Sequence, residues 1–283
     1  MAPLISVAIV TRDRADLFER FALPSLLSLS PGEAEVLIID QSSGDATRRL
    51  AGRVSGARYL RSRPGLSRGR NLALSAASAP LLAFTDDDVE FGRGWPAGIC
   101  EGFARDPRVG VVCGLGLNST GDQLPHRHPG FYTWPVNPFG LAHGFNLAVR
   151  RTAIDEVGPF DERLGAGAEF EAGEDSDLVY RMLRAGWTVL CHEGITVVHH
   201  TWRHGREELR LHASYGLGVG AQTTKHVRRG DATAGRLAVA EVARHGLTVA
   251  RYLVRRRRHE MLLQFAWLKG LLVGFTRGLA RRL

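Results

Sequence analysis

Short apolar runs alternate with amphipathic segments over the first 115 residues of the chain. We interpret the apolar runs as strands, at residues 5–10, 36–40, 58–61, 81–85 and 109–113. The segments between them have helical patterns, at residues 15–29, 45–54, 67–78 and 94–104. Strands rich in Val and Ile that alternate with helices are typical of βαβ units and of a parallel sheet covered on both faces. The pattern therefore predicts an α/β fold with a mostly parallel central sheet flanked by helices.

The middle of the chain is less regular. Residues 117–143 are rich in Pro, Gly, His and aromatic residues, and a long loop of this kind is often functional. A strand-like piece and a short helix follow, and they end at the turn Gly158-Pro159. The elements expected after this turn are a helix at 174–184, which Gly186 ends, and two strands at 188–191 and 195–198.

The last part of the chain is helical in pattern and strongly basic. The whole chain has a net charge of +8, but residues 226–283 alone hold 13 Arg or Lys against 3 acidic residues. A near-neutral body with a basic tail indicates that the tail meets an anionic surface. The apolar stretch at 261–283 is interrupted by Gln264, Lys269 and Arg277, so its longest uncharged run is shorter than the ~20 residues that cross a bilayer.

Two interpretations of this apolar stretch are open. It is either a helix in the membrane interface, with Trp267 and Phe265 on its apolar side, or an amphipathic helix packed on the body. In the first case anionic lipid headgroups would face the arginines, including the run at 255–258. The chain starts with neither a signal peptide nor a membrane span, and its 3 scattered cysteines suit a reducing compartment. We therefore expect a cytoplasmic protein, peripheral at the inner face of the membrane if the first interpretation holds.

Three consecutive carboxylates follow one of the predicted strands, in the stretch LLAFTDDDVEF at residues 81–91. Asp86, Asp87 and Asp88 repel one another, and they are costly to bury unless cations or hydrogen-bond donors compensate them. In open α/β sheets, ligands bind beyond the carboxyl ends of the strands, which is where these side chains are expected. Carboxylate oxygens suit Mg²⁺ or Mn²⁺, which commonly bind through carboxylates together with substrate phosphates.

Two further polar clusters lie downstream. The stretch GEDSDLVYRML places Glu174, Asp175 and Asp177 at the start of a helix, where carboxylates cap the helix and where Asp175 could also act as a general base. The stretch VVHH ends a strand in His199 and His200, and a neutral imidazole can complete a divalent-metal site. Because side chains alternate along a strand, only one of the two histidines is expected to reach that site.

Taken in this order, these stretches make the chain resemble the family 2 glycosyltransferases over about residues 4–205. The matching stretches are SVAIVTRDR, VLIIDQSSGDAT, GLSRGRNLALSAA, LLAFTDDDVEF, GFNLAVRR, VGPFDERLG, GEDSDLVYRMLRAGWTVL and VVHH. The resemblance implies the GT-A fold, in which the central sheet is Rossmann-like. It also implies a catalytic domain at 1–205, with a nucleotide-binding half at 1–115 and an acceptor-side half at 116–205, followed by a basic amphipathic helical region at 206–283. The family's usual acidic pair reads Asp40-Gln41 here, which leaves the identity of the donor open.

The resemblance assigns roles to individual side chains. Those expected to bind the nucleotide sugar are Thr11, Arg12 and Asp40 round the base, Asp87 at the ribose, Asp86 beside it, Arg70 at the diphosphate and Asn146 near the sugar. Those expected to bind the metal are Asp88, Asp86 and His199, with His200 as the alternative to His199. For three of these residues a structural role is the competing interpretation: a turn or a helix N-cap for Asp40, a solvated helix face for Arg70 and a buried turn amide for Asn146.

The implied activity is transfer of a sugar from a nucleotide-diphosphate sugar to a hydroxyl of a saccharide or lipid-linked acceptor, in polysaccharide, cell-envelope or glycoconjugate synthesis. Mn²⁺ or Mg²⁺ held by Asp88 would neutralise the charge that grows on the leaving diphosphate. Asp175 would remove the acceptor proton, with Glu174 as the second choice and Asp177 as a cap or a partner of an arginine. A single base and a single displacement would invert the anomeric centre.

Two rival functions are open at this point. A sugar-nucleotide nucleotidyltransferase also combines an α/β sheet with acidic metal ligands, but a glycine-rich loop is expected after its first strand, and TRDRADLF contains no glycine. A non-catalytic sugar-nucleotide-binding protein is the second rival. The arginine run at 255–258 could contact nucleic-acid phosphates, but it lies among apolar residues without a recognition motif, so we expect no nucleic-acid partner.

Overall fold

The computed structural model describes residues 3–125, 127–200, 205–281 and 283 of the chain. Its contacts divide into two compact units. The first unit is Met1–Phe160 with Asp175–Thr201, and the second is Asp161–Glu174 with Trp202–Leu283. The segment 161–174, which lies inside the domain predicted at 1–205, thus groups with the C-terminal helices.

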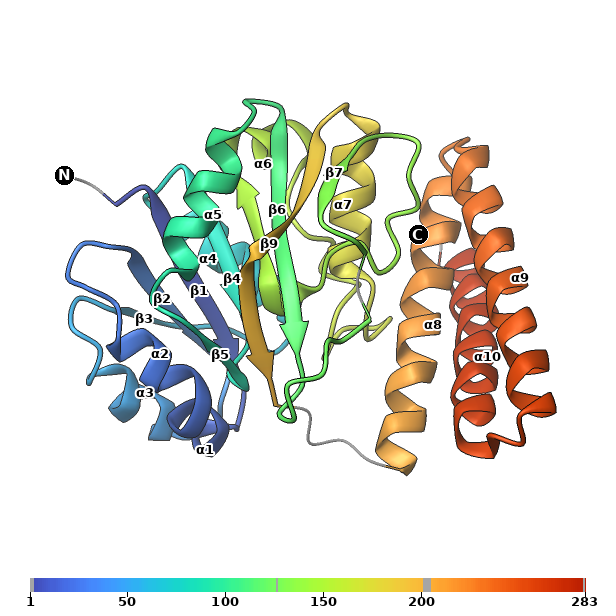
Figure 1. Ribbon diagram of the computed structural model, residues 1–283, viewed down its shortest axis with the longest axis horizontal. Helices are drawn as coiled ribbons and strands as arrows, with labels where there is room; N and C mark the ends of the chain where they lie inside the picture. The colour runs from blue at the N-terminus through green and yellow to red at the C-terminus, as the bar shows by residue number, and fades with distance from the viewer. Residues whose placement is uncertain (1–2, 126, 201–204, 282) are drawn as a thin grey trace. The chain divides into compact units, whose positions relative to one another are not determined.

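The first unit is built on a sheet whose strands run in the order β3-β2-β1-β4-β8-β6-β9-β5, with β7 paired to β9 (Figure 1). The strands are β1 (Ile5–Thr11), β2 (Glu35–Asp40), β3 (Arg58–Arg61), β4 (Leu81–Thr85), β5 (Val89–Phe91), β6 (Val109–Leu117), β7 (Gly130–Tyr132), β8 (Leu147–Arg150) and β9 (Thr188–His199). Strands β3, β2, β1 and β4 are parallel to one another, and β6 is parallel to β9. Antiparallel pairs join β8 to β4 and β6, and join β5 and β7 to β9.

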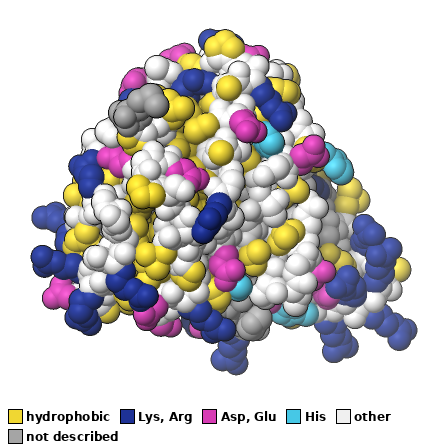
Figure 2. Space-filling view, turned by 60° about the vertical axis from the view of Figure 1, so that its left-hand side comes forward, with side chains coloured by type: hydrophobic (Ala, Val, Ile, Leu, Met, Phe, Trp, Pro, Cys, Tyr) yellow, Lys and Arg dark blue, Asp and Glu magenta, His cyan; other side chains and the backbone are white. Residues whose placement is uncertain are grey.

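Helices cover both faces of this sheet, as the alternating pattern predicts. They are α1 (Ala15–Leu17), α2 (Leu23–Leu27), α3 (Ala46–Ala51), α4 (Leu66–Ala76), α5 (Trp95–Ala104), α6 (Arg151–Val157) and α7 (Glu174–Arg184), with a π-helical turn at Phe18–Ala22 and a 3₁₀ turn at Gly144–Asn146. One buried cluster joins β1 and β2 to α2, α3 and α5. The other joins the opposite face to α4, α6 and α7. In the space-filling view of Figure 2, acidic, basic and apolar side chains are interspersed over the visible face.

One prediction about the strands is wrong. The segments expected as two strands at 188–191 and 195–198 form the single strand β9. Its pairing with β6 shifts in register between His192 and Thr196, so Glu193, Gly194 and Ile195 form a bulge inside the strand. A bulge inserts residues without ending the ladder, which is why a glycine at this place does not mark a turn.

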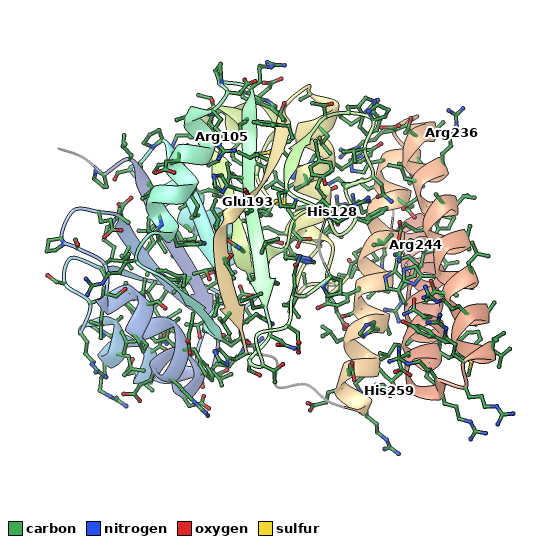
Figure 3. All side chains as sticks on the ribbon, in the orientation of Figure 1. Arg105, His128, Glu193, Arg236, Arg244 and His259 are labelled. Atoms are coloured by element: carbon green, nitrogen blue, oxygen red, sulfur yellow. The ribbon has the colours of Figure 1, made fainter. Side chains whose placement is uncertain are left out.

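The second unit consists of the segment Asp161–Glu174 and the three long helices α8 (Arg206–Val227), α9 (Ala232–Val254) and α10 (Arg258–Ala280). Glycines let α8 and α10 approach closely: a Cβ at Gly216 would overlap the Trp267 carbonyl oxygen, and a Cβ at Gly274 would overlap that of Leu217. In the first turn of α10, His259 Nε2 lies 2.9 Å from Glu208 Oε2 of α8 (Figure 3). Among the described helices, none combines the length and the apolar character that a membrane span requires.

Trp267, expected beside Phe265 on the apolar side if the helix lies in a membrane interface, is buried within the second unit. The indole is 6% exposed and stacks on His245 of α9, with ring centroids 3.7 Å apart. His245 Nδ1 lies 2.6 Å from Gln264 Oε1, and Arg244 Nη2 lies 2.7 Å from His245 Nε2. Because the guanidinium can only donate, His245 is neutral with its proton on Nδ1. Phe265 is 50% exposed, so only this member of the predicted pair faces solvent.

Candidate active site

The candidate site lies where three parallel strands of the first unit end. In the sheet register Thr11 is level with Asp40, and Ile9 is level with Thr85. The residues that follow β4 therefore begin beside the end of β1. Thr11 Oγ1 donates a hydrogen bond of 2.6 Å to Asp87 Oδ2, which fixes the middle aspartate against β1.

The three adjacent carboxylates are compensated by arginines from other parts of the first unit. Asp87 and Asp88 are 1% and 2% exposed. Arg14, which precedes α1, places Nη1 3.1 Å from Asp87 Oδ1 and donates from Nη2 to Asp88 Oδ2. Arg70 of α4 lies on the other side of the cluster, with Nη2 3.8 Å from Asp86 Oδ1. The guanidinium groups of Arg14 and Arg70 thus offset much of the repulsion among the three carboxylates.

Asp86, Asp88 and His199 offer ligand atoms that all lie within 4.8 Å of one another. The antiparallel pairing of β9 with β5 sets His199 opposite Val89, and its Nε2 lies 3.5 Å from Asp88 Oδ1. His200 is directed elsewhere, because its ring stacks on Phe21 with centroids 3.8 Å apart.

The chemistry of this cluster fits a hard divalent cation. Asp88 Oδ1 is buried, and no hydrogen-bond donor among the described residues satisfies it. Two carboxylates and one imidazole form a donor set that suits Mg²⁺ or Mn²⁺. These residues could hold such an ion with coordination positions left for phosphate oxygens.

Burial perturbs the two aspartates beside Asp88. Burial raises the pKa of Asp87 to about 7, although the Arg14 charge and the Thr11 hydroxyl act in the opposite direction. Burial likewise raises the pKa of Asp86, and the Arg70 charge opposes this shift. A cation in the cluster would favour the ionised forms of both groups, because it adds positive charge where burial disfavours negative charge.

A chain of contacts links Asp175 to this cluster. The backbone N–H of Gly144 donates to Asp175 Oδ2 over 3.1 Å, and the N–H of Ser176 donates to Oδ1 over 2.6 Å. Arg70 packs directly over Gly144, where a Cβ would lie 2.9 Å from its Nη1. The same guanidinium reaches Asp86. The predicted base and the predicted metal ligands therefore belong to one connected site.

Arg70 is buried, so the structure excludes a solvated helix face for it. It is 2% exposed and packs over the adjacent rings of Phe84 and Phe160, whose centroids are 5.6 and 5.5 Å from its Cζ and 5.4 Å from each other. Burying a guanidinium is costly unless it is paired or stacked, and here it is both.

At the predicted base-binding end of the site, Asp40 and Gln41 hydrogen-bond to other groups of the protein. Asp40 is fully buried and accepts hydrogen bonds from Ser42 N and from the Tyr59 hydroxyl at 2.8 and 2.7 Å, which is a turn and not a helix cap. Arg12 is exposed beside Asp13. Gln41, which departs from the family pattern, makes a reciprocal pair with the backbone of Gly65, at 2.9 and 3.1 Å.

Three other predicted residues have contacts that bear on their roles. Asn146 accepts from Trp95 Nε1 and donates to the Leu115 and Ile195 carbonyls, so its amide is engaged by the protein. Asp177 Oδ2 lies 2.9 Å from Arg181 Nε. Pairing with an arginine is one of the two roles expected for Asp177. Glu174 is buried at 6% exposure.

Sequence reasoning missed Arg14 and Gly144. Arg14 belongs to the quoted stretch SVAIVTRDR, where Arg12 is the predicted ligand. Gly144 opens the stretch GFNLAVRR. Both lie in recognised motifs, but their contacts join residues 74 and 31 positions apart in the chain, which no local pattern reveals.

The sheet topology, with an acidic cluster at the end of β4, agrees with the GT-A fold that the resemblance implies. The family model described as glycosyl transferase family 2 matches residues 6–158. That match covers more than half of the chain, and the chain belongs to this family. It is accordingly a glycosyltransferase.

Individual relatives agree with this assignment. The chain is 28% identical over 242 residues to an N-acetylglucosaminyl-diphospho-decaprenol L-rhamnosyltransferase of Mycobacterium tuberculosis H37Rv, a match that covers 71% of this chain and 77% of that protein. It is 30% identical over 183 residues to the pre-mycofactocin glycosyltransferase of the same strain, covering 60% and 37%. A mannosyltransferase from Pyrobaculum calidifontis, solved in complex with GDP-Man and Mn²⁺, superposes with a TM-score of 0.65 at 17% identity, over 97% of this chain and 87% of that one. The last likeness concerns the fold.

Proposed function

We propose that this chain transfers a sugar from a nucleotide-diphosphate donor to an acceptor hydroxyl in one metal-dependent, inverting displacement. The observation that carries the proposal is the contact chain from Asp175 through Gly144 and Arg70 to Asp86. Among the described residues Asp175 pairs with no guanidinium group, and it lies at the same site as a carboxylate cluster compensated by arginines. A base and an electrophile-binding site must be neighbours for a direct displacement.

The donor would lie along the ends of β1, β2 and β4. Thr11, Arg12 and Asp40 would surround the base, and Asp87 would face the ribose. Arg70 would supply a buried positive charge for the diphosphate, because its guanidinium packs over two adjacent aromatic rings beside Asp86. Asn146 would act near the donor sugar chiefly by shaping the backbone round it, since its amide is already hydrogen-bonded.

Asp88, Asp86 and His199 would hold Mn²⁺ or Mg²⁺. When bound, the dication offsets the charge that develops on the departing diphosphate. The Thr11 hydroxyl holds Asp87 against β1 beside these ligands. Mn²⁺ is present in the solved mannosyltransferase of similar fold, which supports this choice of metal.

Asp175 would take the proton of the acceptor hydroxyl. The N–H groups of Gly144 and Ser176 hold one oxygen each and leave lone pairs on both. Glu174 is the second choice for this base, because it directly precedes Asp175 in the chain. Its side chain is buried. With one base and no covalent intermediate, the configuration of the anomeric carbon is inverted.

Replacing Asp175 by Asn tests this assignment. Transfer should be abolished, because an amide cannot accept the proton, while binding of UDP or GDP in the presence of Mn²⁺ should remain close to wild type. The matched control is Asp155→Asn, on the exposed side of α6, which should transfer normally. Loss of nucleotide binding together with transfer would instead assign Asp175 a structural role. Release of pyrophosphate in place of a nucleoside diphosphate would favour the nucleotidyltransferase.

We also propose a saccharide or lipid-linked acceptor, met at a membrane surface. The name of one relative specifies a diphospho-decaprenol substrate. In the second unit, α10 exposes large apolar side chains at helical spacing: Leu262, Phe265, Leu272 and Leu279. The arginine run at 255–258 lies at the turn that precedes α10 and is exposed. Such a face suits the interface of an anionic membrane, and the protein would then be cytoplasmic and peripheral.

Vesicle binding tests the membrane contact. The protein should sediment with vesicles that contain anionic phosphatidylserine or phosphatidylglycerol at low salt, and less with pure phosphatidylcholine vesicles. Phe265→Ser should weaken this binding, because the ring is exposed and its removal costs little folding stability. If the protein sediments with neither kind of vesicle, the proposal is contradicted.

A further inference from the structure

The guanidinium of Arg14 occupies a position between two of the three clustered aspartates. Its Nη1 lies 3.1 Å from Asp87 Oδ1, and its Nη2 donates to Asp88 Oδ2. The Arg14 side chain is 28% exposed, whereas those of Asp87 and Asp88 are 2% and 3% exposed. Arg14 therefore reaches from the surface into the cluster and neutralises charge that solvent does not reach.

Asp88 faces this guanidinium and the predicted metal site with different oxygens. Oδ2 is engaged by Arg14, while Oδ1 faces His199 Nε2 at 3.5 Å. A dication bound at Oδ1 would thus share one carboxylate with a permanently charged arginine. Like charges on the two sides of a buried carboxylate repel one another, and burial strengthens this repulsion because solvent screens it less.

The charges of the cluster show when this repulsion is offset. Three carboxylates face the two guanidinium groups of Arg14 and Arg70, so the cluster carries at most one net negative charge. A dication alone would make the site positive. A dication that arrives with a donor diphosphate would leave it negative or neutral, because the diphosphate brings its own negative charges.

We propose that Arg14 is a resident counter-cation that keeps divalent-metal binding weak until the donor diphosphate is present. This inference rests on the proposed metal site at Asp86, Asp88 and His199. Its consequence is that metal and donor each strengthen the binding of the other. Arg14 acts on the metal through Asp88 and takes no part in the transfer itself.

A different role for Arg14 would have the opposite sign. If the guanidinium only held Asp88 in its orientation, its removal would leave the carboxylate free to rotate and would weaken metal binding. If it limits metal binding by charge, its removal strengthens metal binding. The affinity for metal in the absence of nucleotide separates the two.

The experiment measures Mn²⁺ binding to the full chain without nucleotide, from the electron paramagnetic resonance signal of free Mn²⁺. Arg14→Gln and Arg14→Met should both bind Mn²⁺ at least about tenfold more tightly than wild type, because each removes a full charge from the cluster. Arg14→Lys keeps the charge and should stay close to wild type. The matched control is Arg53→Gln, which removes the same charge from an exposed pair with Glu19 and should change nothing.

Two further readings complete the test. Adding Asp88→Asn to Arg14→Gln should abolish the gained affinity, which shows that the tighter Mn²⁺ is bound at the cluster. Unchanged or weaker Mn²⁺ binding by both neutral variants, with wild type binding Mn²⁺ in the presence of UDP or GDP, would overturn the role of Arg14 alone. Absence of Mn²⁺ binding by every variant, with and without these nucleotides, would overturn the proposed metal site as well.

Discussion

Replacing Gly144 by Ala should weaken binding of the donor diphosphate, because the added methyl group would overlap the Arg70 guanidinium. A Cβ on the Gly144 backbone would lie 2.9 Å from Arg70 Nη1 and 3.0 Å from its Cζ, and closer still to Nη2. The guanidinium cannot move toward Phe84 and Phe160, because the two adjacent rings already pack against it. It must therefore withdraw from the diphosphate position, although Arg70 itself is unchanged.

The size of the effect follows from the interaction that is lost. A hydrogen bond to a charged group contributes about 1.5–3 kcal/mol, which corresponds to about 10- to 150-fold in the dissociation constant. The measurement is isothermal titration of UDP and GDP in the presence of Mn²⁺. Metal binding should be retained, because within the described part of the chain no hydrogen bond or ion pair joins Gly144 to Asp88 or His199.

Two controls identify Arg70 as the cause. Gly92→Ala adds the same methyl group where no heavy atom lies within 4 Å, and it should bind nucleotide as wild type does. In an Arg70→Ala background, Gly144→Ala should have little further effect, because the group that it displaces is already gone. Wild-type affinity in the single Gly144→Ala variant, or an undiminished loss in the Arg70→Ala background, would refute the reasoning.

Three further predictions concern stability and metal. Burial and the adjacent Arg244 lower the pKa of His245 to about 4. As the pH falls, the unfolded chain therefore takes up a proton at His245 before the folded chain does. The free energy of unfolding should fall by up to about 3 kcal/mol from pH 6.5 to 4. Urea titrations should show this fall in wild type and a flatter profile in His245→Gln. Gly274→Val should destabilise the second unit by about 1–3 kcal/mol or more, because its side chain would overlap the Leu217 carbonyl, whereas Gly246→Ala, in open space, should not destabilise it. Removal of divalent metal with EDTA should stop transfer, and Mn²⁺ or Mg²⁺ should restore it; full activity in EDTA would contradict metal dependence.

Much of the fold follows from local patterns in the sequence. The strands at 58–61 and 81–85 and the helix at 174–184 have the predicted bounds, because each is a short run of one periodicity between clear breaks. The prediction of two strands in place of β9 is wrong because residues 193–195 form a bulge, and a bulge and a turn can have the same local composition. The burial of Trp267 could not be predicted either, because it depends on a stacking partner in a different helix.

The candidate site was predictable where a strand end fixes it. Asp86, Asp87 and Asp88 follow β4 directly, so the sheet alone determines their place. The fate of Arg70 was not predictable, because a lone arginine in a helix is usually solvated, and its burial depends on Phe84 and Phe160 from other segments. The compensation of the aspartates by Arg14 likewise depends on the turn between β1 and α1, which local periodicity does not define.

The most direct test of the account is the anomalous-difference map of crystals grown with Mn²⁺ and UDP or GDP. The account predicts a manganese peak bonded to Asp88 and the diphosphate, with His199 and Asp86 beside it and the carboxylate of Asp175 facing the same cavity. A peak at any other part of the chain, or a diphosphate bound away from Asp88 and Arg70, would contradict it.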